Sequence, residues 1–429
     1  CIYGVRNQLL AFKNTQMIIQ KIHTFWEDTA KVWLHELLEM FRDEGALLFV
    51  ILLPLAYPLL YSWIYNNEVV REVPVAVVDC SNSATSREFV RHIDASPDVM
   101  VAERCASLEE ASRLVGKHKV YGVVYLPSDF DTHLNRMEQA HVSVYCNMGL
   151  MLTYKAIFQT CTAVAADMNS GIQIRLSGNK TNREDELTTA PLSITDVPMF
   201  NNTSGYGNFI LPAVLVLILQ QILLLGIGIT YGTSYEKNRF LRIRPMLDRR
   251  FGLARIMVGR TMGFFVLFML IAAWVILGVP RLFHFVQLIH FTDFLLFTMP
   301  YLLACIFFAI TFSFFVRQRE NVMLLVVFTS VPFLFLSGIS WPKSNVPEFW
   351  QYISWLAPSS FGIQGFVKLN TLGATFSDIL PEIKGLWAQT VVYGALASLV
   401  TYWQVKGSKP ETEDRTAETK EHAALENQK

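Results

Sequence analysis

Charged residues are scarce in this chain of 429 residues: they make up 17% of it, against roughly a quarter of an ordinary soluble domain. The 36 Lys and Arg residues equal the 36 Asp and Glu residues, so the formal net charge is 0. This balance excludes a strongly basic nucleic-acid binder, because no net positive field is available to collect phosphates. Hydrophobic residues reach 52% instead, which excludes disorder of the bulk. The composition is typical of a membrane protein.

Six long apolar runs contain neither a charged side chain nor a histidine. A transmembrane helix needs about 20 such residues, because roughly 30 Å of hydrocarbon is crossed at about 1.5 Å per residue. The fold class that we expect is therefore an α-helical polytopic membrane protein with six transmembrane helices. The expected spans are residues 45–65, 209–231, 261–280, 294–316, 321–341 and 385–405.

Basic residues gather between the second and third expected spans, in residues 236–260, where the only acidic residues are Glu236 and Asp248. Cytoplasmic loops of membrane proteins carry the excess of Lys and Arg, so this loop is predicted to lie in the cytoplasm. The basic residues are Lys237, Arg239, Arg242, Arg244, Arg249, Arg250, Arg255 and Arg260.

Alternation of the spans then assigns a side to every other segment. Residues 1–44 and the charged tail 406–429 are expected in the cytoplasm, whereas residues 66–208 and the aromatic, proline-rich loop 342–383 are expected outside. Within the N-terminal segment, residues 22–41 have an amphipathic helical pattern. Beside a first span, such a helix is expected to lie in the inner membrane interface.

The outer segment 66–208 is long enough to bury a core of its own. Short β-branched runs alternate in it with helical patterns, which predicts an inserted α/β domain with an at least partly parallel sheet. These elements are followed by a longer helical pattern at residues 150–174. A polar, flexible segment at residues 177–189 then returns towards the second span. Strands are expected at 73–78, 99–102, 120–125 and 142–145, and helices at 83–93, 108–115 and 130–137.

Four cysteines of this outer domain, Cys80, Cys105, Cys146 and Cys161, admit two interpretations. In an oxidising compartment they would form up to two disulfides, in any of three connectivities. Alternatively, they are small buried core residues. The sequence leaves both interpretations open.

No pattern for chemistry by the chain itself is present. The segment Gly178-Asn179-Lys180-Thr181 has the wrong order for a phosphate-binding loop and follows no expected strand, so we expect no ATPase site in this chain. Neither a catalytic triad, nor a pair of catalytic carboxylates, nor a metal-ligand cluster stands out. We therefore expect a non-enzymatic membrane subunit that binds no metal or cofactor itself.

Three stretches form a pattern that matches a known family. They are residues 199–201, which lead into the second span, residues 235–239 after that span, and residues 336–342 after the fifth. With the order of one span, a large outer domain and five further spans, the chain resembles the permease subunit of ABC-2 type exporters, in particular drug-efflux-like permeases. The residues that match the third motif and its continuation are Gly338, Pro342, Pro347 and Pro358.

The resemblance implies an ATP-driven export function that needs partners. A separate cytoplasmic ATPase dimer would bind ATP and Mg and would contact the basic loop around Glu236, Lys237 and Arg239. A second permease copy would complete a homodimer in the bacterial inner membrane, in contact with lipid, and a periplasmic adaptor would join in cells with two membranes. The large outer domain points to a drug-like or lipid substrate.

Polar residues within the spans are candidates for lining a pathway: Gln220, Gln221 and Gln389. The alternative is that they form hydrogen bonds between packed helices.

Other functions remain as rivals. An ion-coupled transporter needs buried charged residues, which the expected spans lack. A non-transporting receptor or anchor would merely display residues 66–208, although five further spans exceed what an anchor requires.

Overall fold

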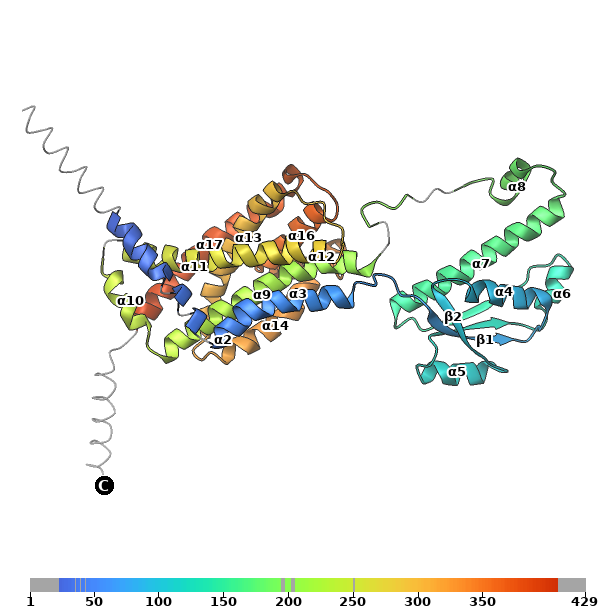
Figure 1. The fold of residues 1–429 in the computed structure, drawn as a ribbon, viewed down its shortest axis with the longest axis horizontal. Coiled ribbons are helices and arrows are strands. Elements are labelled where there is room, and N and C mark those ends of the chain that lie inside the picture. Colours follow the sequence, from blue (N-terminus) through green and yellow to red (C-terminus); the bar gives the residue numbers. More distant parts are fainter. Residues whose placement is uncertain are drawn as a thin grey trace, which may run out of the picture. The chain divides into compact units, whose positions relative to one another are not determined.

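The structure is a computed structural model that describes residues 23–34, 36–38, 40–42, 44–193, 197–201, 205–249 and 251–407. The chain forms two compact units (Figure 1). One unit comprises Asn67–Pro198, and the other combines the residues before it with those from Met199 onward.

Long apolar helices build the second of these units. Within the described residues, four helices are long and apolar enough to cross a membrane, and they cover the expected second, third, fourth and sixth spans, except that the fourth helix ends at 315, one residue before the predicted end. Each is longer than the span that was predicted for it. They are α9 (Tyr206–Glu236), α11 (Gly252–Ala272) with its continuation through η2 (Ala273–Gly278) and α12 (Val279–Leu282), α13 (Phe291–Phe312) with η3 (Ser313–Phe315), and α17 (Leu380–Gly407).

Two shorter apolar helices occupy the positions of the expected first and fifth spans. The first consists of α2 (Glu44–Leu47), η1 (Leu48–Leu52) and α3 (Leu53–Ile64). The second, α14 (Asn321–Leu336), ends earlier than the predicted 341, so that boundary was wrong. The reason is local: Gly338 has a φ of +89°, a left-handed conformation that ends a helix and that favours glycine.

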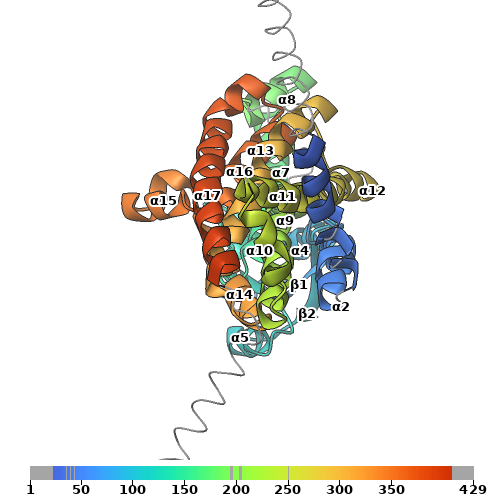
Figure 2. The same ribbon diagram turned by 90° about the vertical axis from the view of Figure 1, so that its left-hand side faces the viewer.

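Helix α9 forms the core of this unit. It is buried along nearly its whole length and contacts α3, α13, α14 and α16 (Figure 1; Figure 2 looks along the helices). Two of its glycines permit close approach of neighbours: a Cβ on Gly226 would overlap Val50, and one on Gly228 would lie 2.7 Å from Val322 Cγ1. Small residues at such crossings let membrane helices pack tightly.

The segment between α14 and α17, which includes the aromatic loop, contains short helices. Helix α15 leaves the rings of Phe349, Trp350 and Tyr352 exposed, whereas α16 is largely buried against α9, α13 and α17. The loop therefore returns into the helix bundle. Its elements are η4 (Lys343–Asn345), α15 (Glu348–Ser354), α16 (Pro358–Asn370) and η5 (Phe376–Ile379).

Residues 67–198 form an α/β unit around a four-stranded sheet with the strand order β2-β1-β3-β4. The pairs β1–β2 and β1–β3 are parallel and β3–β4 is antiparallel, which confirms the prediction of a partly parallel sheet. Central β1 is apolar and largely buried, as a strand covered on both faces must be. The strands are β1 (Val73–Asp79), β2 (Val99–Arg104), β3 (Gly122–Leu126) and β4 (Ser143–Cys146).

Helices cover both faces of this sheet. Residues of α4 and α7 share one apolar core with β1, and α5 shares a smaller one with the opposite face. The polar return is more ordered than predicted, because Thr181 and Glu184 form a capping box that starts α8. The helices are α4 (Ala84–Asp94), α5 (Leu108–Gly116), α6 (Phe130–Asn135), α7 (Met151–Ser177) and α8 (Asn182–Thr189).

The cysteines of this unit are unpaired and differ in exposure: Cys80 is exposed, whereas Cys105 and Cys161 are buried. Burial raises the pKa of the Cys161 thiol to about 12 and also raises that of Cys105. We expect a maleimide to label Cys80 in the purified native protein and the other two only after denaturation, because the thiolate reacts. The Cys80→Ser variant is the control. Equal labelling of Cys161 and Cys80 in the native protein would contradict this packing.

Candidate functional site

Three of the candidate residues lie where α9 ends. Glu236 is the last residue of α9, Lys237 follows as its C-cap, and Arg239 precedes the short helix α10 (Phe240–Leu247). Buried Phe240 and Ile243 fix α10 to the bundle, where it contacts α11 and α17. The structure thus brings the three candidates together at one end of the bundle, beside a short basic helix.

Glu236 also has an intramolecular partner that the sequence did not predict. Its Oε1 accepts a hydrogen bond from the backbone N–H of Arg319 at 3.0 Å. One turn earlier, a Cβ on Gly232 would lie 2.9 Å from the Arg319 backbone, so the glycine permits this close approach. The end of α9 is therefore joined to the turn between α13 and α14.

The basic loop is bound by acidic residues of the N-terminal helix, whose described residues begin at 23. Asp28 Oδ2 accepts hydrogen bonds from Arg249 at 2.9 Å and from Arg255 at 2.7 Å. Glu36 forms an ion pair with Arg260, with 2.5 Å between Oε1 and Nε. Asp28 and Glu36 are eight residues apart and thus share a helix face. This acidic face holds the basic loop 236–260 in place. The sequence had identified that loop only by its excess of positive charge.

The Arg260–Glu36 pair is the most buried of these contacts, with 2% and 6% of the two side chains exposed. The guanidinium also lies over two aromatic rings, 4.8 Å from the centroid of Tyr231 and 5.3 Å from that of Phe240. Cation–π contacts of this kind strengthen when they are desolvated. Arg260 therefore joins the N-terminal helix, α9, α10 and α11 at one point.

The opposite face of the N-terminal helix is apolar. Trp26, Leu34, Leu38 and Phe41 are all about half exposed or more. Trp26 and Phe41 lie within residues 22–41, for which the sequence predicted an amphipathic helix, while Ile22 lies outside the described residues. An acidic face on the protein and an apolar face away from it suit a helix that lies in a membrane interface.

The signature residues have structural roles at helix ends. Gly338 ends the α14 segment, Pro342 precedes η4, Pro347 precedes α15, and Pro358 is the first residue of α16. Proline suits the start of a helix because it lacks the N–H that would be unpaired there and its φ is already helical. The motif thus sets the short helices that follow α14.

Comparison with known families gives one result. The profile of a family described as ABC-2 family transporter protein matches residues 45–399. The chain belongs to this family. It is therefore an ABC-2 permease, the membrane subunit of a transporter whose family implies an ATPase partner. The comparison with curated proteins gives no match.

Two of the three pathway candidates of this ABC-2 permease hold helices together. Gln220 Oε1 accepts the backbone N–H of Ser359 at 2.6 Å, in the first turn of α16, where the N-cap residue Ala357 offers no side-chain acceptor. Gln389 Nε2 donates to the carbonyl of Trp355 at 2.6 Å. These contacts are the interhelical hydrogen bonds that the sequence left as the alternative.

Gln221 differs from both. It is buried, and in the part of the chain that the structure describes neither of its side-chain polar atoms has a hydrogen-bond partner. The hydroxyls of Thr298 and Ser360 are likewise buried and unpartnered there. Buried polar groups without partners cost free energy that a polar ligand would recover. Gln221 is thus the candidate for which the packing supplies no hydrogen-bond partner among the described residues.

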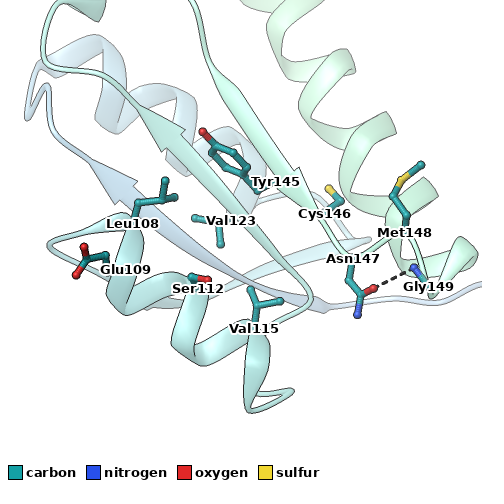
Figure 3. A pocket seen from close by; sticks show the side chains of 10 residues that line it. All are labelled: Leu108, Glu109, Ser112, Val115, Val123, Tyr145, Cys146, Asn147, Met148 and Gly149. Carbon is teal, nitrogen blue, oxygen red and sulfur yellow. Dashed lines mark hydrogen bonds between the residues drawn. The ribbon is translucent and has the colours of Figure 1, made fainter.

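The α/β unit of the permease has an open pocket on one face of its sheet (Figure 3). It lies between α5, which contributes Leu108, Glu109 and Ser112, and strand β4, which contributes Tyr145. Helix α5 contacts β1 and β3, so the edge strand β4 is left open on this side.

Among the described residues, no group of three or more metal-binding side chains is present.

Proposed function

We propose that the chain is the permease of an ABC exporter with six membrane spans, in which a separate cytoplasmic ATPase dimer binds and hydrolyses ATP with Mg. The observation that carries this proposal is the short helix α10 with its basic flanks, packed on α11 and α17 and fixed by the buried Arg260–Glu36 pair. Membership of the ABC-2 family supports it.

Helix α10 is suited to deliver ATPase closure to the spans. Its exposed side carries Arg242 and Arg244, which suit an acidic groove on a partner, while Phe240 and Ile243 anchor its other side. A packed element of this kind moves as a rigid body. A push on α10 would reach α11 through Arg260 and α9 through Tyr231.

The proposed substrate is bulky and either amphiphilic or hydrophobic, such as a drug-like molecule or a lipid, and it is moved outward.

One face of α14 supports a second permease copy as partner. Its side chains Leu324, Val327, Phe328 and Val331 are more than half exposed, and apolar. Residues 67–198 are proposed to lie outside and to dock an adaptor where the cell has two membranes.

The proposed function is tested by purification from native membranes in mild detergent. We expect an ATPase with a phosphate-binding loop to copurify in a two-to-two complex, and ATP hydrolysis by that complex to rise with substrate. A receptor or anchor that only displays residues 67–198 would purify without an ATPase, and this result would refute the exporter proposal.

Replacing Glu236 separates its two candidate roles. Glu236→Lys is expected to abolish substrate-stimulated ATPase activity, since it removes the acceptor for the Arg319 N–H and reverses the charge. Glu236→Gln keeps an acceptor oxygen and removes only the charge. Retained stimulation in Glu236→Gln would assign Glu236 to the internal hydrogen bond, whereas loss in both variants would assign its charge to the ATPase contact. Full stimulation in Glu236→Lys would exclude both roles.

A further inference from the structure

A second group of charged residues lies at the end of the bundle opposite α10. Lys343 belongs to η4, Lys368 to the last turn of α16, and Glu382 to the first turn of α17. Helix α14 starts near the turn that Glu236 contacts and ends shortly before Lys343, which places this group at the other membrane surface. The sequence did not single it out.

This group contains two lysines but one buried carboxylate. Lys368 Nζ donates to Glu382 Oε1 at 2.7 Å, and only 8% of the Glu382 side chain is exposed. The second carboxylate oxygen, Oε2, has no hydrogen-bond partner in the described part of the chain. The Lys368–Glu382 pair is therefore complete as an ion pair and leaves no negative charge for a second cation.

Lys343 is that second cation. Its stem lies over Gly338, where a Cβ would come within 3.0 Å of Lys343 Cγ, so the signature glycine makes room for it. The side chain is half-buried, and among the described residues its ammonium group has no hydrogen bond or ion pair. Burial lowers the pKa of Lys343, Glu382 opposes that shift, and Lys368 adds to it. The group thus carries one uncompensated positive charge.

The surroundings indicate the depth at which this charge lies. Trp341, Trp350 and Trp355 are each about half exposed in the same segment of the chain. Tryptophan rings of this kind are enriched at the level of lipid headgroups, where one end of the ring is apolar and the other is hydrated. A ligand that compensates Lys343 at this depth must carry a negative charge on a headgroup.

We propose that Lys343 and Lys368 form a binding site for the phosphate of an anionic phospholipid, in the leaflet at the membrane surface opposite α10. Phosphate oxygens accept hydrogen bonds from both ammonium groups, and lysines near a membrane surface attract such headgroups. The acyl chains then lie along the exposed apolar side chains of this segment. The site requires that the chain spans a membrane and does not depend on the ATPase partner.

The experiment follows the melting temperature of the purified full-length permease in detergent. Phosphatidylglycerol is expected to raise it, and phosphatidylcholine and inorganic phosphate are expected to raise it less. Lys343→Gln should increase the phosphatidylglycerol concentration for half of the effect about fivefold. Lys343→Arg should preserve binding, and Lys384→Gln, which removes an exposed lysine of α17, is the matched control.

Glu382→Gln gives the opposite sign and so separates binding from folding. Removing the competing carboxylate should lower the phosphatidylglycerol concentration for half of the effect, which a folding defect cannot do. Equal losses in Lys343→Gln and Lys384→Gln would show diffuse attraction and refute a site. An equal response to inorganic phosphate or to phosphatidylcholine would refute an anionic-lipid site, and so would weaker binding in Glu382→Gln.

Discussion

The Arg260→Met variant of the permease is expected to lose about 3 to 5 kcal/mol of stability, the typical cost of removing one partner of a buried ion pair. The change leaves the Glu36 carboxylate buried without its counter-charge and removes the cation that lies over Tyr231 and Phe240. The measurement is the free energy or the midpoint of unfolding of the purified protein, by denaturant and by heat.

A double variant and a surface variant complete this experiment. Glu36→Gln combined with Arg260→Met removes both charges and is expected to recover a large part of the loss, because no uncompensated charge stays buried. Lys31→Met changes an exposed residue of the same helix and should have little effect. If the double variant is no more stable than Arg260→Met, the pair is not the reason for the loss.

The Gly252→Ala variant is expected to uncouple the ATPase from transport and to cost about 3 kcal/mol of stability. Gly252 is the first residue of α11, and a Cβ there would overlap the carbonyl oxygen of Met246 and lie 2.7 Å from that of Leu247. Both oxygens belong to the backbone of α10, which can yield only by moving as a whole. Substrate stimulation of ATP hydrolysis in the reconstituted complex is the measurement.

Another glycine provides the control for this substitution. A Cβ on Gly171, in the middle of α7, would meet no atom within 4 Å, so Gly171→Ala should leave coupling unchanged and stability equal or slightly higher. Full coupling in Gly252→Ala would show that α10 tolerates displacement, and would exclude a fixed α10 as the element that transmits ATPase closure.

The sequence predicted the order of elements well because burial leaves a strong pattern. The β1 segment is apolar from Val73 to Val78 and α4 is amphipathic, and both lie within a few residues of the predicted bounds. Helix ends were predicted less well. A search for charge-free runs stops at the first charge, yet α11 and α17 continue past such residues and bury Arg260 and Glu382. Neither side chain was therefore recognised as buried.

Contacts between distant segments account for most of what was missed in the candidate site. Asp28 and Arg249 are 221 positions apart, and a single sequence contains no signal that pairs them. The spacing of Asp28 and Glu36 was the available hint, since eight residues place both on one helix face. The amide candidates looked equivalent in sequence, and only the packing of α16 distinguishes Gln220, which caps it, from the unpaired Gln221.

The early end of α14 has a consequence for the lipid around it. Sixteen residues at about 1.5 Å each give a helix of about 24 Å, whereas the hydrocarbon layer is roughly 30 Å thick. As a span, α14 is therefore mismatched to the bilayer, which compensates by thinning locally. Its apolar side chains face outward from this chain, on the face that the second permease copy is proposed to cover. Where two such short helices meet, an amphiphile would have the shortest distance to cross between leaflets.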